Sequence, residues 1–439
     1  TVTAYRIADA DINAENNLSY VFEEDVPAPY NTIEGLTAIE SDGSAFVQGS
    51  DMQKAAGAIA AAFASGNAYT QATATGDSVD LTLGSGYYLV RVTSTSGKAR
   101  VYQNMVVDVS PVAQDDGTYA PKAEQSLTVK STPVMVTKGV GENYEDRTDA
   151  YYIGQMVPFR VTTAIPSYPI DSLNATFVIS DVPTPGLEID TESIKINDVT
   201  AATCDDYTLT ASATGYTIVF AKDYILANPG VGIVVTYQAK LTSAAFSHSD
   251  TDVTGNTAAV EFNPNPYIDT TVKPDDTTVV QTYGYVFPKT DASGNPLAGA
   301  VFTLYHDADC TQPVFGDDGE TPLTSTSTIV NGVAYVYFED LASGTYTAKE
   351  TTVPAGHLAA PNQTFTLSAD ACTGDNPATA EVVENNYLVS TVDVVDPDQP
   401  TLPVTGGAGT MAVTAAGVVL IAAGALAIRR FRRNDSMQG

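Results

Sequence analysis

Few side chains in this 439-residue chain combine residue types and spacings that could do chemistry. The cysteines Cys204, Cys310 and Cys372 lack the short spacing of a zinc or redox pair. Cys310 and Cys372 fall in one predicted domain, so an exported chain could join them as a disulfide, with two separate thiols as the equal alternative. The three histidines share no motif. We therefore expect no metal site, no cofactor and no turnover of a small-molecule substrate.

The C-terminal end shows an ordered series of segments. A Pro- and Asp-rich linker, 391–401, precedes the motif LPVTG and then an uncharged stretch, 407–428, long enough to cross about 30 Å of hydrocarbon as one helix. Four arginines follow at once and should stay in the cytoplasm. The sequence thus predicts that everything before the span lies outside the cell. It also favours a secretory signal that has been removed.

This order resembles the cell-wall sorting signal of Gram-positive surface proteins, which sortase cleaves between the Thr and Gly of LPxTG. The resemblance implies recognition through Leu402 and Pro403, cleavage between Thr405 and Gly406, and transfer of the Thr405 carboxyl to an amine. Pro403 supplies a kinked, extended backbone, and Gly406 leaves room for a catalytic thiol. The implied partners are sortase and peptidoglycan. The implied location is the cell wall, reached after a transient stage in the membrane.

Residues 281–390 read as one β-sandwich, because stretches such as VAYVYF alternate apolar and polar residues between turns such as ASGN. The domain also resembles the B-type repeat of collagen adhesins and Gram-positive pilins. In that family a lysine and an asparagine form an isopeptide bond beside a glutamate, and the resemblance assigns these roles to Lys289, Asn385 and Glu350. Alternation along the last strand favours Asn385 over Asn386, which stays the competing acceptor.

The residue types suit this reaction. Burial in an apolar core lowers the pKa of a lysine amine and so favours the neutral, nucleophilic form. Burial also raises the pKa of a carboxyl group, so a protonated Glu350 could polarise the amide carbonyl while ammonia leaves. The reaction would need no external enzyme.

A second unit, 132–272, resembles the A-type isopeptide domain of pilin shafts. The resemblance places the lysine at Lys138, the acceptor at Asn256 and the acid at Asp181, which would act as Glu350 does in the next domain. The alternative for Asp181 is an ordinary cap at a turn.

Residues 1–131 resemble the N-terminal domain of the same pilins through the stretch GYYLV. The Ala-rich stretch DMQKAAGAIAAAFASG predicts a helix that ends by Gly66. Arg6 stands where such domains often carry a lysine, and its guanidinium stays protonated. We therefore expect no isopeptide bond in this domain.

The elements that would hold these side chains are strands. Abundant Thr, Val and Tyr with frequent turn residues predict an all-β chain of tandem immunoglobulin-like sandwiches, followed by the C-terminal transmembrane helix. Acidic residues outnumber basic ones 52 to 20, a net charge of −32, which argues against nucleic-acid binding.

Two functions fit this reading. The chain could be the shaft subunit of a covalent pilus, in which sortase joins Thr405 of one copy to a lysine of the next. The family's YPK motif is absent, so Lys130 in LTVK is favoured narrowly over Lys122 in APK as that lysine. The alternative is an adhesin or minor pilin attached once to the wall, whose N-terminal domain binds a host-surface ligand.

Overall fold

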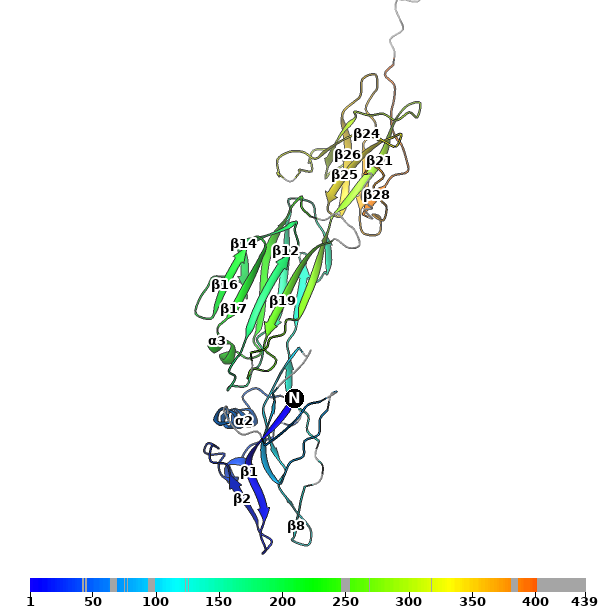
Figure 1. The fold of residues 1–439 in the computed structure, drawn as a ribbon. Helices are drawn as coiled ribbons and strands as arrows, with labels where there is room; N and C mark the ends of the chain where they lie inside the picture. Colours follow the sequence, from blue (N-terminus) through cyan, green and yellow to red (C-terminus); the bar gives the residue numbers. More distant parts are fainter. Residues whose placement is uncertain are drawn as a thin grey trace, which may run out of the picture.

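The computed structural model describes residues 1–400 apart from 42, 44–45, 64–68, 75, 77, 94–98, 123, 125, 246–252, 268, 317 and 380–385. Three β-rich units follow one another along an elongated molecule, with the N-terminal unit at one end (Figure 1). The predicted all-β class is confirmed. No helix of the described part is long and apolar enough to span a membrane, and the predicted span, 407–428, lies outside that part.

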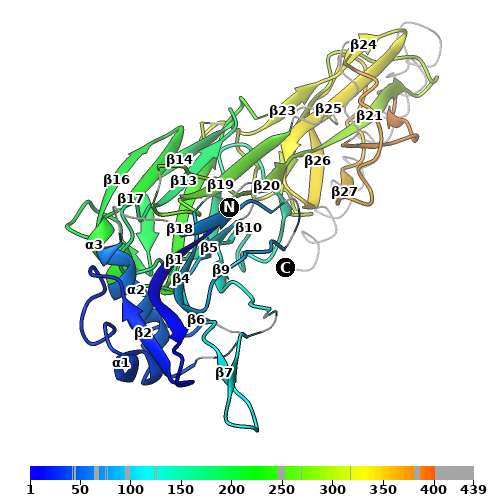
Figure 2. The same cartoon turned by 60° about the horizontal axis from the view of Figure 1, so that its bottom comes forward.

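The first unit is built on one antiparallel sheet in the order β2-β1-β4-β6, with β3 also on β1. Its strands are β1 (Val2–Ile12), β2 (Leu18–Phe22), β3 (Thr70–Ala72), β4 (Gly86–Val92) and β6 (Met105–Asp108). Two helices, α1 (Ile33–Thr37) and α2 (Asp51–Ala62), lie beside this sheet (Figure 2). The predicted helix is therefore present; Ser50 caps its start and Ile59 is buried against Ile7 and Leu89.

The second unit is a sandwich of two sheets, β10-β12-β18-β14-β15 and β11-β20-β19-β13-β17-β16. The strands of the first sheet are β10 (Val136–Val140), β12 (Met156–Ala164), β14 (Leu187–Ile196), β15 (Val199–Thr200) and β18 (Gly232–Leu241). Those of the second are β11 (Thr148–Ala150), β13 (Phe177–Pro183), β16 (Tyr207–Ser212), β17 (Gly215–Phe220), β19 (Thr254–Phe262) and β20 (Asp275–Gln281). Inward residues such as Phe159 and Phe177 fill the space between them, and a short helix, α3 (Lys222–Ala227), closes one end.

The third unit is also a sandwich. One sheet has the order β24-β25-β21-β28, with β29 also on β21, and the other has the order β23-β22-β26-β27. The strands are β21 (Tyr283–Asp291), β22 (Val301–Tyr305), β23 (Thr324–Thr326), β24 (Thr328–Val330), β25 (Val333–Leu341), β26 (Gly344–Thr352), β27 (Gln363–Leu367), β28 (Tyr387–Val389) and β29 (Val394–Asp396). The stretch 391–401 is thus not simply a linker, because it supplies β29.

Both joints between units are tight. Between the second and third units, β20 ends at Gln281 and β21 begins at Tyr283, with Thr282 buried between them. Near the first joint, β5 (Arg100–Tyr102) pairs with β9 (Ser131–Pro133). A second short ribbon, β7 (Val112–Ala113) with β8 (Tyr119–Ala120), lies at the end of the first unit that is remote from the second (Figure 1).

Candidate functional site

In the second unit, the fold brings together the three side chains that the A-type resemblance singled out. Lys138 comes from β10 in one sheet, and Asp181 and Asn256 come from β13 and β19 in the other. Asn256 lies opposite Pro183, two residues beyond Asp181, so both point from the same face of their sheet. All three are buried, Asp181 and Asn256 completely. The site therefore bridges the two sheets through the core.

The contacts at this site are direct. The Lys138 ammonium pairs with the Asp181 carboxylate. Its Nζ also donates a hydrogen bond of 2.6 Å to the hydroxyl of Tyr237, and Asn256 Nδ2 donates one of 2.8 Å to the same hydroxyl. The rings of Phe159 and Tyr237 lie 5.0 and 5.1 Å from Nζ. The amine and the amide are thus held by one shared partner inside an aromatic pocket.

Burial sets the protonation of this pair. It lowers the pKa of Lys138, partly opposed by the charge of Asp181, and it raises the pKa of Asp181, partly opposed by Lys138. Both shifts favour a neutral amine beside a protonated carboxyl. That is the state in which an amine is nucleophilic and an acid can donate a proton.

Tyr237 is a site residue that the sequence reasoning missed. It lies on β18, where buried and half-buried residues alternate, so its inward direction could be predicted. Its contact with Lys138 could not be predicted, because β10 and β18 are not neighbours in the sheet but lie on either side of β12.

In the third unit, Lys289 on β21 and Glu350 on β26 both face the core from opposite sheets and are buried. Lys289 Nζ donates to the carbonyl oxygens of Thr290 at 3.3 Å and Val394 at 3.2 Å. Its charge partner is a carboxyl that the sequence reasoning did not single out: Lys289 Nζ lies 2.5 Å from Oδ1 of Asp396, with both side chains fully buried.

Glu350 completes this group. Its Oε2 accepts a hydrogen bond of 2.7 Å from the backbone of Ala360. Burial raises the pKa of Glu350 to about 7; the Ala360 hydrogen bond opposes this shift, the neighbouring Asp396 carboxyl adds to it, and Lys289 lowers it. Glu350 can therefore gain or lose a proton near neutral pH.

The predicted acceptor Asn385 lies outside the described residues. The competing acceptor, Asn386, is held away from Lys289. Its Nδ2 donates to the carbonyl oxygen of Thr282 at 3.0 Å, and its neighbour Tyr387 pairs with Gly284. Gly284 and Lys289 are five positions apart on one strand, a separation of roughly 16 Å.

The two candidate lysines for polymerisation differ in environment. Lys130 lies just before β9 at the first joint and is buried, and desolvation lowers its pKa. Its carbonyl oxygen accepts a hydrogen bond of 2.8 Å from the backbone of Gln103. Lys122 is half-buried, and its Nζ donates to the carbonyl oxygen of Asp108 at 2.7 Å.

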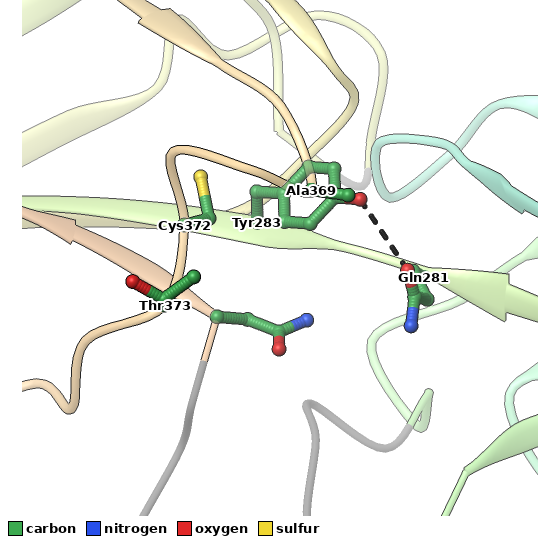
Figure 3. Close-up of a pocket in the computed structure, with 6 residues that line it drawn as sticks. Gln281, Tyr283, Ala369, Cys372 and Thr373 are labelled. Carbon is green, nitrogen blue, oxygen red and sulfur yellow. Dashed lines mark hydrogen bonds between the residues drawn. The ribbon is translucent and has the colours of Figure 1, made fainter.

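The disulfide that the sequence allowed is absent, and the alternative of separate thiols is what the structure has. Cys310 and Cys372 are both free thiols. Cys372 is buried in the core of the third unit, whereas the Sγ of Cys310 contacts the Asn362 side chain. Cys372 borders a small pocket of about 300 Å³ at the second joint, together with Tyr283 and Gln281, whose side chains hydrogen-bond (Figure 3).

In the first unit, Arg6 pairs with Glu23 at 2.8 Å, and this hydrogen bond raises the pKa of the guanidinium further. The sorting motif, Leu402 to Gly406, lies outside the described residues.

Comparison with known protein families finds matches to two segments of the chain. Residues 284–381 match the family model of a prealbumin-like fold domain, and residues 395–436 match that of the LPXTG cell wall anchor motif. The chain is 24% identical to the trypsin-resistant surface T6 protein of Streptococcus pyogenes over 60% of its own length and 51% of that protein. It is also 24% identical to the fimbrial subunit type 2 of Actinomyces naeslundii, over 79% of its length and 70% of that protein. The chain thus spans about half the length of the first of these relatives.

Among solved structures, the T6 backbone pilin of S. pyogenes matches with a TM-score of 0.58 and 16% identity, covering 91% of this chain and 96% of that one. That pilin is described as having a modular three-domain structure. The anchor motif, the prealbumin-like domain and this fold define a cell-wall-anchored Gram-positive surface protein. The relatives and structures to which the chain is similar include a fimbrial subunit and a backbone pilin.

Proposed function

We propose that this chain is the structural shaft subunit of a sortase-assembled covalent pilus that supports adhesion, and that Lys–Asn isopeptide bonds formed by the chain itself stabilise it. The observation that carries the proposal is the buried group of Lys138, Asp181 and Asn256, held together by Tyr237. Desolvating a lysine and a carboxyl costs free energy, so a buried pair of this kind adds little to the stability of the fold. A role in a chemical reaction explains the pair better.

In the second unit, the reaction balances without any other reactant. The neutral Nζ of Lys138 attacks the side-chain carbonyl carbon of Asn256, and protonated Asp181 stabilises the developing oxyanion. The new C–N bond forms, the bond to Nδ2 breaks, and the proton lost by the amine passes through Asp181 to the departing ammonia. Asn256 Oδ1 accepts no hydrogen bond within the described part of the chain, so it is available to a proton donated by Asp181.

In the third unit, Lys289 is the nucleophile and Glu350 donates and accepts the proton. The supporting observation is their common burial beneath the two sheets, with Glu350 poised to titrate near neutral pH.

Between subunits, Lys130 is the acceptor of the Thr405 acyl group. Desolvation lowers its pKa and enlarges the neutral fraction that attacks the thioester on sortase. The thiolate of sortase leaves and the Thr405 carbonyl carbon becomes joined to the Lys130 amine. Lys122, hydrogen-bonded at Asp108, is the alternative acceptor.

The arrangement suits a fibre under tension. Force entering at Lys130 would pass to Lys138 and cross to Asn256 through the covalent bond. The strands between Lys138 and Asn256 would then carry little load. Hydrogen bonds alone would otherwise have to resist it, each contributing about 1 kcal/mol.

The test is a denaturing gel of wall extracts from cells carrying the native chain, Lys130→Ala or Lys122→Ala. We expect a ladder of boiling-resistant polymers with the native chain and with Lys122→Ala, and its collapse with Lys130→Ala. Collapse with Lys122→Ala alone would move the acceptor to Lys122. A single wall-bound band in all three strains would overturn the shaft assignment and leave a singly anchored adhesin or minor pilin.

A further inference from the structure

The chain carries, outside the residues assigned so far, one buried acid in direct contact with a proposed nucleophile. Asp396 lies on β29, the last strand of the described chain, and β29 pairs in parallel with β21. In that pairing Lys289 lies opposite Val394, so the Lys289 side chain reaches two residues along the neighbouring strand to Asp396. Neither side chain is exposed to solvent.

Asp396 is otherwise short of partners for a buried carboxyl. Apart from its ion pair with Lys289 and its contact with the Glu350 carboxyl, neither of its oxygens has a hydrogen-bond partner among the described residues. The Glu350 carboxyl is its neighbour, and two carboxyls make a hydrogen bond only when they share a proton. A buried carboxyl between an amine and a second carboxyl is the geometry of a condensation site.

We propose that Asp396, rather than Asn385, is the acceptor of the isopeptide bond in the third unit, and that Lys289 Nζ and Asp396 Cγ join with loss of water. This inference rests on the proposed function, since it names the partner within a self-formed cross-link. It differs in the leaving group, because an aspartate acceptor releases water where an asparagine acceptor releases ammonia.

The step balances as follows. A proton moves from the Lys289 ammonium to the Asp396–Glu350 carboxyl pair, leaving a neutral amine and a protonated Asp396. Nζ attacks Cγ, and Glu350 protonates the Asp396 hydroxyl as it departs and takes up the second amine proton. One C–N bond forms, one C–O bond breaks, water leaves, and Glu350 ends in its starting state.

The position of this bond matters for the fibre. Asp396 lies closer to Thr405 than Asn385 does, so a bond at Asp396 would pass tension straight from the sorting motif to β21. The segment 290–395, which includes β28, would then carry no tension. With Asn385 as acceptor, the segment from Asn386 onwards would carry the load.

The first test is fragmentation mass spectrometry of peptides from the full native chain, digested with two proteases. We expect a branched peptide that joins Lys289 to Asp396 with a loss of about 18 Da. A branched peptide from Lys289 to Asn385, with a loss of about 17 Da, would overturn the inference and leave the proposed function intact. Unmodified Lys289 beside a linked Lys138 would overturn the third-unit bond while the second-unit bond stands.

The second test uses the fibre itself. A specific protease site is inserted between Thr391 and Val392, which are exposed, with Val392 71% exposed. If Asp396 is linked to Lys289, cleavage leaves the boiled polymer ladder unchanged. If Asn385 is the acceptor, cleavage breaks every subunit and the ladder collapses, which overturns the inference. Absence of any ladder before cleavage would instead count against the shaft function.

Matched variants complete the design. Asp396→Ala should remove the Lys289 branched peptide, whereas Asn385→Ala should keep it, and the Lys138–Asn256 peptide should persist in both as evidence of folding. Loss of the Lys289 peptide in Asn385→Ala alone would contradict the assignment.

Discussion

Lys138 and Asn256 donate hydrogen bonds of 2.6 and 2.8 Å to one acceptor, the hydroxyl of Tyr237. This shared contact aligns the amine with the amide across the two sheets of the second unit. It makes Tyr237 a positioning residue for the proposed cross-link, since its hydroxyl touches both reacting groups but gains no bond in the product.

Replacing Tyr237 with Phe should slow formation of the Lys138–Asn256 bond. The lost hydroxyl removes the one acceptor that these two buried donors share, at a cost of about 1–3 kcal/mol. A time course of the mass loss after refolding would show this. Tyr216→Phe is the matched control, because Tyr216 is buried beside Tyr237 and its hydroxyl has no hydrogen-bond partner among the described residues. Equal rates for both variants would argue against a positioning role.

The pKa of Glu350 predicts how the stability of the third unit depends on pH when the cross-link is absent. In Lys289→Met, folded Glu350 keeps a proton that unfolded Glu350 releases above its ordinary pKa of 4.5. Unfolding therefore releases a proton in a window that begins at that value and extends above about 7, because the variant lacks the Lys289 charge that lowers the pKa of Glu350. Stability should fall as pH rises through this window and level off above it.

Urea-dependent hydrogen exchange of the β21 and β26 amides in the full chain would measure this dependence. Glu350→Gln in the same background should flatten it, which separates Glu350 from the neighbouring Asp396. A dependence that survives Glu350→Gln unchanged would show that another group titrates.

A cut inside the third unit should leave the chain in one piece. A specific protease site inserted after Gly294, in the exposed turn that follows β21, lies between Lys289 and either acceptor. After cleavage and boiling, the native chain should run as a single species and Lys289→Ala as two fragments. Two fragments from both would refute a cross-link in this unit.

The first joint should depend on one buried ion pair. Arg91 of the first unit lies 3.2 Å from Asp171 of the second, and the hydroxyl of Tyr267 donates to Asp171 at 3.1 Å. Asp171→Ala strands a buried guanidinium, so we expect a loss of about 3–5 kcal/mol and faster exchange in α2 and β4. Lys54→Ala, which removes an exposed ion pair on α2, should cost at most about 1 kcal/mol. Equal effects would show that the joint does not rely on the pair.

Sequence alone determined the sandwich class and the α2 helix, and it singled out the three side chains that the fold brings together in the second unit. Apolar–polar alternation and turn residues are local signals, so strands and turns can be read from a few neighbouring positions. Lys138, Asp181 and Asn256 each lie in a stretch that resembles the A-type domain. The sorting motif was likewise readable as a contiguous string.

Only the tertiary structure decided which partners these residues meet. Tyr237 reaches Lys138 across β12, Lys130 becomes buried where two units join, and the thiols of Cys310 and Cys372 stay apart. Asp396 reaches Lys289 because a stretch that reads as linker adds a parallel strand to β21. Parallel pairing joins segments distant in the chain and leaves no local pattern, so the acid at Lys289 was invisible until the strands were in place.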